Sequence, residues 1–179
     1  MTREPVQFMS HHTKVEYKLP APSLLSIESA KQLAAGRVVG HKCPECGKVY
    51  VPARGYCPLC VIETTAAHEV EVQPRGIVTT FSVITPLQYQ GQEEHDDYAQ
   101  ATILLAGTDS TISMQRLDGI PIDDVRTGMR VEAVWLPESE RSASPEGAAR
   151  GFGLGRAITG WKLTGEPDAP VEEYGEHIL

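Results

Sequence analysis

Apolar and polar residues alternate over much of the chain after residue 75 with the period of β-strands. The pattern is clearest in residues 129–135, where every second position is apolar: Met129, Val131, Ala133 and Trp135. Arg130 and Glu132 lie between them, so this segment predicts a strand with one buried and one exposed face. Four further segments are rich in β-branched or other apolar residues and also predict strands: 76–84, 99–106, 111–117 and 156–163.

The order of these five strands favours a small barrel. The compact segment 122–128 lies between the third and fourth strands and has room for one helical turn. Three strands, a short linking turn and two more strands fit an OB-like barrel. The polar segments 88–97 and 137–153 separate strands one and two and strands four and five. In an OB barrel such loops flank the ligand-binding face, although loops of this length are equally common as surface excursions.

The pattern changes to that of a helix in residues 23–36. One face of this segment carries Ile27, Ala30 and Ala34, with Leu33 nearby. Pro22 and Ser23 suit the start of a helix, and Gly36 suits its C-terminal cap. The segment therefore predicts a short amphipathic helix, whose apolar face packs either on its own chain or on a partner subunit.

All the cysteines of the chain lie in two C-x-x-C turns: Cys43, Cys46, Cys57 and Cys60. Two such turns direct four thiolates at one tetrahedral ion, so we predict a metal site. Gly47 suits the positive φ that follows a tight turn, whereas Val61 follows the second turn, which is therefore expected to differ. His41, two residues before the first cysteine, is expected to be a neighbour of the site and not a ligand.

The identity and role of the metal follow from its four sulfur ligands. Four thiolates leave no open coordination position, so a structural role is expected and Lewis-acid catalysis is disfavoured. Zinc is the expected ion, while iron remains the alternative, because sulfur ligands alone do not separate the two metals. A ribbon of this size buries little apolar surface by itself, and the metal would substitute for a core.

Charge and composition narrow the class of partner. The chain has 179 residues and a net charge of −8, which opposes binding to nucleic acid phosphates. Its apolar runs are short, such as residues 103–106, so no segment reaches the length of a membrane span. The polar N-terminus lacks the apolar region of a secretory signal. These features predict a soluble cytoplasmic protein with no membrane partner.

Candidate ligand-binding residues are few, and no catalytic residue is assigned. The glycine-rich segment 151–155 lacks the spacing of a dinucleotide-binding loop and precedes a strand. Three arginines bracket it and form a candidate site for an anionic ligand such as a CoA phosphate: Arg141, Arg150 and Arg156. The acidic segment 93–97 is expected to be a solvated loop, with cation binding as the alternative. No serine or cysteine lies in a recognisable nucleophile motif.

The order of these motifs resembles one family, the acyl-CoA-associated OB-fold proteins with an N-terminal rubredoxin-like zinc ribbon. The resemblance covers residues 23–165: a helix, the two cysteine turns separated by residues 52–54, and then Gly76-x-Val78, which opens a barrel strand. The later stretch 119–131, whose residues 128–131 enter the fourth strand, also fits that pattern.

This resemblance implies a function that composition alone does not. Members of the family are similar to accessory subunits of thiolases and of thiolase-like synthases and aldolases in lipid or steroid metabolism. The larger partner of such heteromeric complexes supplies the catalytic residues, and the small subunit helps to form the acyl-CoA site. The alternatives are a free-standing acyl-CoA or acyl-carrier binding module and, against the acidic charge, a single-stranded nucleic-acid binder.

The expected fold is mainly β: a short N-terminal helix, a rubredoxin-like zinc ribbon and a five-stranded OB-like barrel. We expect residues 1–36 to form an N-terminal extension with the amphipathic helix, and residues 37–66 to form the ribbon. Residues 67–165 would form the OB-fold domain. The acidic residues 166–179 are expected to be an extended tail that lies over the surface of its own chain or of a partner.

Overall fold

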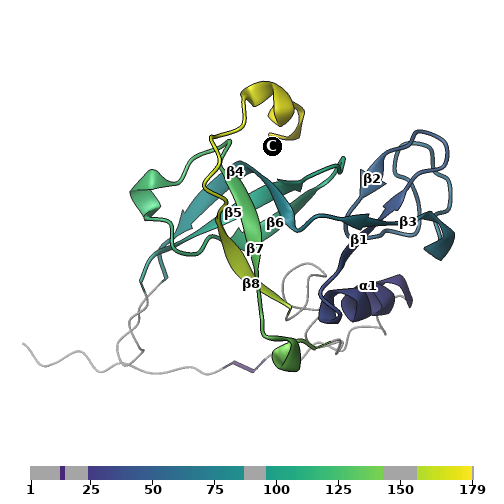
Figure 1. Cartoon of the computed structure of the whole chain (residues 1–179), viewed down its shortest axis with the longest axis horizontal. Coiled ribbons are helices and arrows are strands. Elements are labelled where there is room, and N and C mark those ends of the chain that lie inside the picture. The colour runs from purple at the N-terminus through teal and green to yellow at the C-terminus, as the bar shows by residue number, and fades with distance from the viewer. Residues whose placement is uncertain (1–12, 15–23, 87–95, 143–156, 179) are drawn as a thin grey trace, which may run out of the picture.

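Two antiparallel sheets of different size form the fold in the computed structural model, which describes residues 13–14, 24–86, 96–142 and 157–178 (Figure 1). The smaller sheet has the order β2-β1-β3, from strands β1 (Val38–Lys42), β2 (Val49–Tyr50) and β3 (Glu69–Val72). The larger has the order β6-β5-β4-β7-β8, from β4 (Arg75–Ile84), β5 (Tyr98–Leu105), β6 (Thr111–Arg116), β7 (Arg130–Trp135) and β8 (Ile158–Leu163). The mainly β fold is thus confirmed.

The larger sheet curls into the OB barrel. All five predicted strands are present, and a 3₁₀ turn at Ile122–Asp124 lies within the predicted linking segment. A parallel bridge between Leu117, after β6, and Trp161 in β8 brings the two outer strands together. The alternating residues of β5 that face inward are buried, because the barrel is filled by side chains: Ala99, Ala101, Ile103 and Leu105.

Helix α1 (Leu24–Ala34) packs on its own chain, beneath the small sheet (Figure 1). Ala30 and Leu33 are buried, and Leu33 belongs to the main hydrophobic core. Gly36 ends the helix at φ +80°, and the Arg37 N–H donates to the Gln32 carbonyl at 2.9 Å. That bond caps an otherwise unpaired carbonyl of the last turn, as expected for a glycine that follows a helix.

The hydrophobic core continues from the ribbon into the barrel. Leu33, Val38, Val51 and Val72 come from the helix and the small sheet, and they share one cluster with the barrel residue Trp161. Burial of these side chains therefore stabilises both sheets together. A change that unfolds one sheet removes contacts from the other.

Hydrogen bonds from the loop between β5 and β6 also fix the ribbon to the barrel. The Asp109 carboxylate accepts the Val49 N–H at 2.9 Å and the Lys48 ammonium at 3.0 Å. The Ser110 hydroxyl accepts the Val51 N–H at 2.9 Å and donates to the Val51 carbonyl at 3.1 Å. Burial opposes ionisation of Asp109, but the Val49 N–H and the Lys48 ammonium outweigh it and lower the pKa of the carboxyl. The outer edge of β2 is therefore held by the barrel.

Replacing Ser110 with alanine is expected to lower the free energy of unfolding by about 1–3 kcal/mol. Ser110 and Val51 are both buried, so the variant leaves a backbone N–H without its partner and without water. Urea unfolding followed by circular dichroism measures the change. Ser82→Ala, at an exposed position of β4, is the control and is expected to stay within about 0.5 kcal/mol of the parent. Equal stability of the two variants would contradict the role of this bond.

The C-terminal segment lies across the outside of the barrel (Figure 1). Ala169 and Tyr174 form a small buried cluster with Ile77 and Leu104 of β4 and β5. The Ala169 N–H donates to the Gly128 carbonyl at 2.8 Å. The described tail thus covers its own chain, and it contains two 3₁₀ turns, Val171–Glu173 and Gly175–His177, instead of remaining extended throughout.

Candidate metal centre

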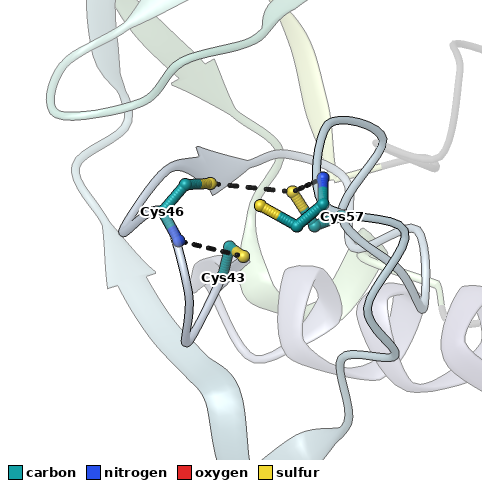
Figure 2. A group of neighbouring side chains, drawn as sticks. Cys43, Cys46 and Cys57 are labelled. Carbon is teal, nitrogen blue, oxygen red and sulfur yellow. Dashed lines mark hydrogen bonds between the residues drawn. The ribbon is translucent and has the colours of Figure 1, made fainter.

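The fold brings the four cysteine sulfurs together at one end of the ribbon. Their sulfur atoms all lie within 4.8 Å of one another: Cys43, Cys46, Cys57 and Cys60. Figure 2 shows three of these side chains converging on one point, with the Cys46 and Cys57 sulfurs 3.7 Å apart. Cys43 and Cys57 are buried, whereas Cys46 lies at the surface. The first cysteine turn lies between β1 and β2, and the second follows β2.

This spacing fits a tetrahedral metal and does not fit disulfides. Bonds of about 2.3 Å to a central ion place the sulfur ligands roughly 3.8 Å apart, whereas a disulfide joins its sulfurs at about 2.05 Å. The described residues that meet here offer only sulfur ligands. Sulfur-only donor sets of this shape are typical of zinc or iron. The residues present therefore fit the predicted metal.

The two cysteine turns have the same backbone, so the expectation that they differ is wrong. The Gly47 N–H donates to the Cys43 carbonyl at 3.0 Å, and the Val61 N–H donates to the Cys57 carbonyl at 2.8 Å. Both residues have positive φ, +74° for Gly47 and +57° for Val61. Val61 thus adopts a left-handed conformation that costs a β-branched residue roughly 1–2 kcal/mol. The turn is imposed by the cysteine geometry and overrides the preference of the valine.

Backbone N–H groups prepare the sulfurs to carry negative charge. The Cys46 N–H points at the Cys43 sulfur, and the Cys60 N–H at the Cys57 sulfur, each at 3.5 Å. The Cys60 N–H lowers the pKa of the Cys57 thiol to about 6. The neighbouring Cys46 sulfur, followed by burial, raises the pKa of the Cys60 thiol to about 12. One thiolate therefore forms readily, whereas a full set of thiolates requires a cation among them.

Two residues, His41 and Tyr50, lie beside the cysteine cluster without contributing a ligand. His41 is buried and its Nδ1 lies 3.1 Å from the Thr64 hydroxyl, so it is a neighbour of the cysteines and does not join them. Burial lowers the pKa of its imidazole. Tyr50 packs against Cys43 and Cys57 in a small cluster, a role that the sequence analysis missed. An aromatic residue between two cysteine turns is the signal that would have indicated it.

Of the three arginines proposed from sequence as a ligand site, the structure describes Arg141 alone. Arg141 donates from Nε to the Leu136 carbonyl at 2.8 Å, and its guanidinium lies 5.2 Å from the Trp135 ring centre. A Cβ at Gly36 would lie 2.7 Å from an Arg141 guanidinium nitrogen, so this side chain lies against the end of α1. Arg150 and Arg156 lie outside the described residues, as do the glycine-rich segment 151–155 and most of the two long loops.

Two family models match successive parts of the chain. Residues 30–63 match the model described as ChsH2, rubredoxin-like zinc ribbon domain. Residues 69–136 match the model described as ChsH2, C-terminal OB-fold domain.

The described part of the chain contains no helix with the length and hydropathy of a membrane span.

Relatives and solved structures agree with these matches. A DUF35 domain-containing scaffold protein of Methanocaldococcus jannaschii is 36% identical over 100 residues, which cover 55% of this chain and 67% of that protein. The Ltp2-ChsH2(DUF35) aldolase structure has a TM-score of 0.54 at 20% identity, over 81% of this chain and 98% of that chain. A DUF35-family protein of unknown function from Sulfolobus solfataricus gives 0.53 at 18% identity, over 78% and 85%. These structural likenesses concern the fold.

Proposed function

Because the chain belongs to the DUF35 family of ChsH2-like proteins, in which a rubredoxin-like zinc ribbon precedes an OB-fold domain, we propose that it is a non-catalytic subunit of a thiolase-like enzyme. In this proposal the subunit assembles with the enzyme and helps to form its acyl-CoA site. The relative in Methanocaldococcus jannaschii is named a scaffold protein, and one structural relative is named as an aldolase of Ltp2 with ChsH2.

The rigid junction between ribbon and barrel is the observation that carries the proposal. A shared core and the bonds of Asp109 and Ser110 hold the two sheets in one orientation. A subunit that positions other chains needs such fixed geometry, whereas a ribbon tethered by a flexible linker would not transmit a defined orientation. The surfaces of the ribbon and of the barrel therefore keep a fixed orientation relative to each other.

The cysteine cluster supports the proposed division of labour. All four cysteines of this chain lie in one cluster, so none is available as a catalytic nucleophile. We assign the catalytic residues to the partner for that reason. The metal is proposed to be zinc in a structural role, because a closed set of four thiolates offers substrate no coordination position.

Co-expression with its proposed thiolase-like partner is expected to give a stable complex. Affinity purification through a tag on this chain, followed by size-exclusion chromatography with mass measurement, tests the assembly. The expected result is a heteromeric species in which the partner gains turnover of an acyl-CoA. Two separate species, together with unchanged activity of the partner enzyme, would overturn the proposed function.

The contacts of Arg141 bear on the alternative of a free-standing CoA-binding module. Its guanidinium already lies on Trp135 and beside the end of α1, so binding of a phosphate there would compete with these contacts. Titration of the isolated chain with CoA by calorimetry separates the two functions. The subunit proposal predicts weak or absent binding to the isolated chain, since the partner completes the site.

A further inference from the structure

The two cysteine turns share a backbone but differ in surface chemistry. Superposing them by sequence places each residue of residues 42–48 on its counterpart in residues 56–62. The first turn carries polar residues or glycine where the second carries large apolar ones, and the four pairs are Lys42 and Tyr56, Glu45 and Leu59, Gly47 and Val61, and Lys48 and Ile62. Since the backbones match, the difference does not arise from the needs of the turn.

The apolar side chains of the second turn do little for the fold of this chain. Val61 is 81% exposed, Leu59 64% and Tyr56 52%. Val61 adds backbone strain that the glycine of the first turn avoids, at φ +57°. An exposed, strained valine gains no burial that would compensate for its conformation. Burial within the described part of the chain therefore does not explain this side chain.

We propose that Tyr56, Leu59 and Val61 form a docking surface, here called the second-turn patch, for an apolar surface of the partner enzyme subunit. This inference rests on the proposed function and names the part of the ribbon that the partner covers. The three side chains expose on the order of a few hundred Å² of largely apolar area, the size at which surface patches are commonly functional. A patch of this size acts as an anchor within a larger interface.

Charge and area argue for a separate protein as the occupant. A second copy of this chain would bring together two molecules of net charge −8. Contact between the second-turn patches of two copies would also bury much less surface than the roughly 800 Å² per partner of a standard stable interface. Nucleic acid is opposed by the same acidic charge. A larger enzyme subunit need not carry the same net charge and can extend the interface beyond the patch.

Exchange of residues between the two turns tests the second-turn patch. Leu59→Glu and Val61→Gly give the second turn the residues of the first, and Glu45→Leu is the reverse exchange and serves as the control. Affinity for the purified thiolase-like partner is measured by calorimetry, with metal content and thermal midpoint measured on each free variant. We expect Leu59→Glu to weaken binding at least about 30-fold, as for an interface anchor, and Glu45→Leu to leave it unchanged.

Val61→Gly gives two effects of opposite direction. It removes the backbone strain, so the thermal midpoint of the free chain is expected to rise by about 2 °C. It also removes a contact, so affinity for the enzyme is expected to fall by about 5-fold. A residue with a purely structural role would change both quantities in the same direction.

The outcomes separate this inference from the proposed function. Parental affinity in both Leu59→Glu and Val61→Gly overturns the second-turn patch and leaves the proposed subunit role intact. Absence of binding by the parent chain overturns both. Self-association of the parent that is lost in Leu59→Glu would show that a second copy is the occupant, and it would overturn the inference as stated.

Discussion

Replacing Cys46 with serine is expected to remove the metal and unfold the ribbon. The variant leaves three sulfur ligands, and the small cluster around Cys43, Tyr50 and Cys57 provides little apolar burial to replace the fourth. Structural zinc contributes about 10–16 kcal/mol to the folding of small zinc-binding domains, so loss of one thiolate removes several kcal/mol of stability. Cys46 lies at the surface, and its loss therefore acts through the metal and not through packing.

The effect is expected to spread beyond the ribbon. Val38, Val51 and Val72 belong to the core that continues into the barrel, and the Val51 backbone is bonded to Ser110. When the ribbon unfolds without metal, the barrel loses its contacts with these valines, so the whole chain is expected to unfold at a lower temperature. Elemental analysis is expected to give one zinc per parent chain and a small fraction of that in the variant.

Glu45→Ala is the matched control, because Glu45 is exposed in the same turn and has no sulfur. It is expected to retain zinc and the parental thermal midpoint. Full metal content and an unchanged midpoint in Cys46→Ser would contradict the assignment of this residue as a ligand. One iron per parent chain would keep the site and replace the proposed metal.

The sequence was sufficient to predict the barrel because its strands carry their own signals. Strand β7 opens with alternating charged and apolar residues, and β4 is rich in β-branched residues, so both segments were recognisable without knowledge of their neighbours. The cysteines were equally clear, since two C-x-x-C turns leave few other uses for their thiols. Gly36 was recognised for the same reason, because a helix end constrains its own backbone.

Features set by tertiary contacts were not predictable in this way. The alternation of β3 is visible in Glu69–Val72, but its pairing with β1 on the ribbon depends on the fold of the intervening turns. The bonds of Asp109 and Ser110 to the edge of β2 join residues about 60 positions apart, and polar residues in a hairpin loop are ordinarily solvated. The left-handed backbone of Val61 was not predictable from the preference of valine for extended conformations, because the geometry of the cysteine site overrides that preference.

Replacing Trp161 with alanine is expected to lower the free energy of unfolding by about 3–5 kcal/mol. Trp161 is fully buried, and its indole N–H donates to the Gln115 side-chain oxygen at 3.0 Å. Its backbone also pairs with the segment after β6, where the Asp118 N–H donates to the Trp161 carbonyl at 2.8 Å. The side chain therefore fills the barrel at the point where its outer strands meet. Urea unfolding followed by circular dichroism measures the loss.

Two further variants separate the packing of Trp161 from its hydrogen bond. Trp161→Phe retains much of the apolar volume but leaves the buried Gln115 oxygen without its donor, at an expected cost of about 1–3 kcal/mol beyond the lost packing. Gln115→Leu in the Trp161→Phe background removes that unpaired oxygen and is expected to recover part of the loss. With Gln115→Leu alone as the remaining member of the cycle, additive effects would mean that the two side chains do not interact, whereas non-additivity measures their coupling energy.

Trp135 supplies a local reporter for the same experiment. It is the only other tryptophan of the chain, and it lies under Arg141, whose guanidinium is beside the end of α1. Because one core joins Leu33 of that helix to Trp161, opening the barrel is expected to free the helix as well. The fluorescence of Trp135 in Trp161→Ala should then change at the same urea concentration as the circular dichroism. A Trp135 transition at a different concentration would show that the end of β7 opens separately from the rest of the fold, and that the chain does not unfold as one cooperative unit.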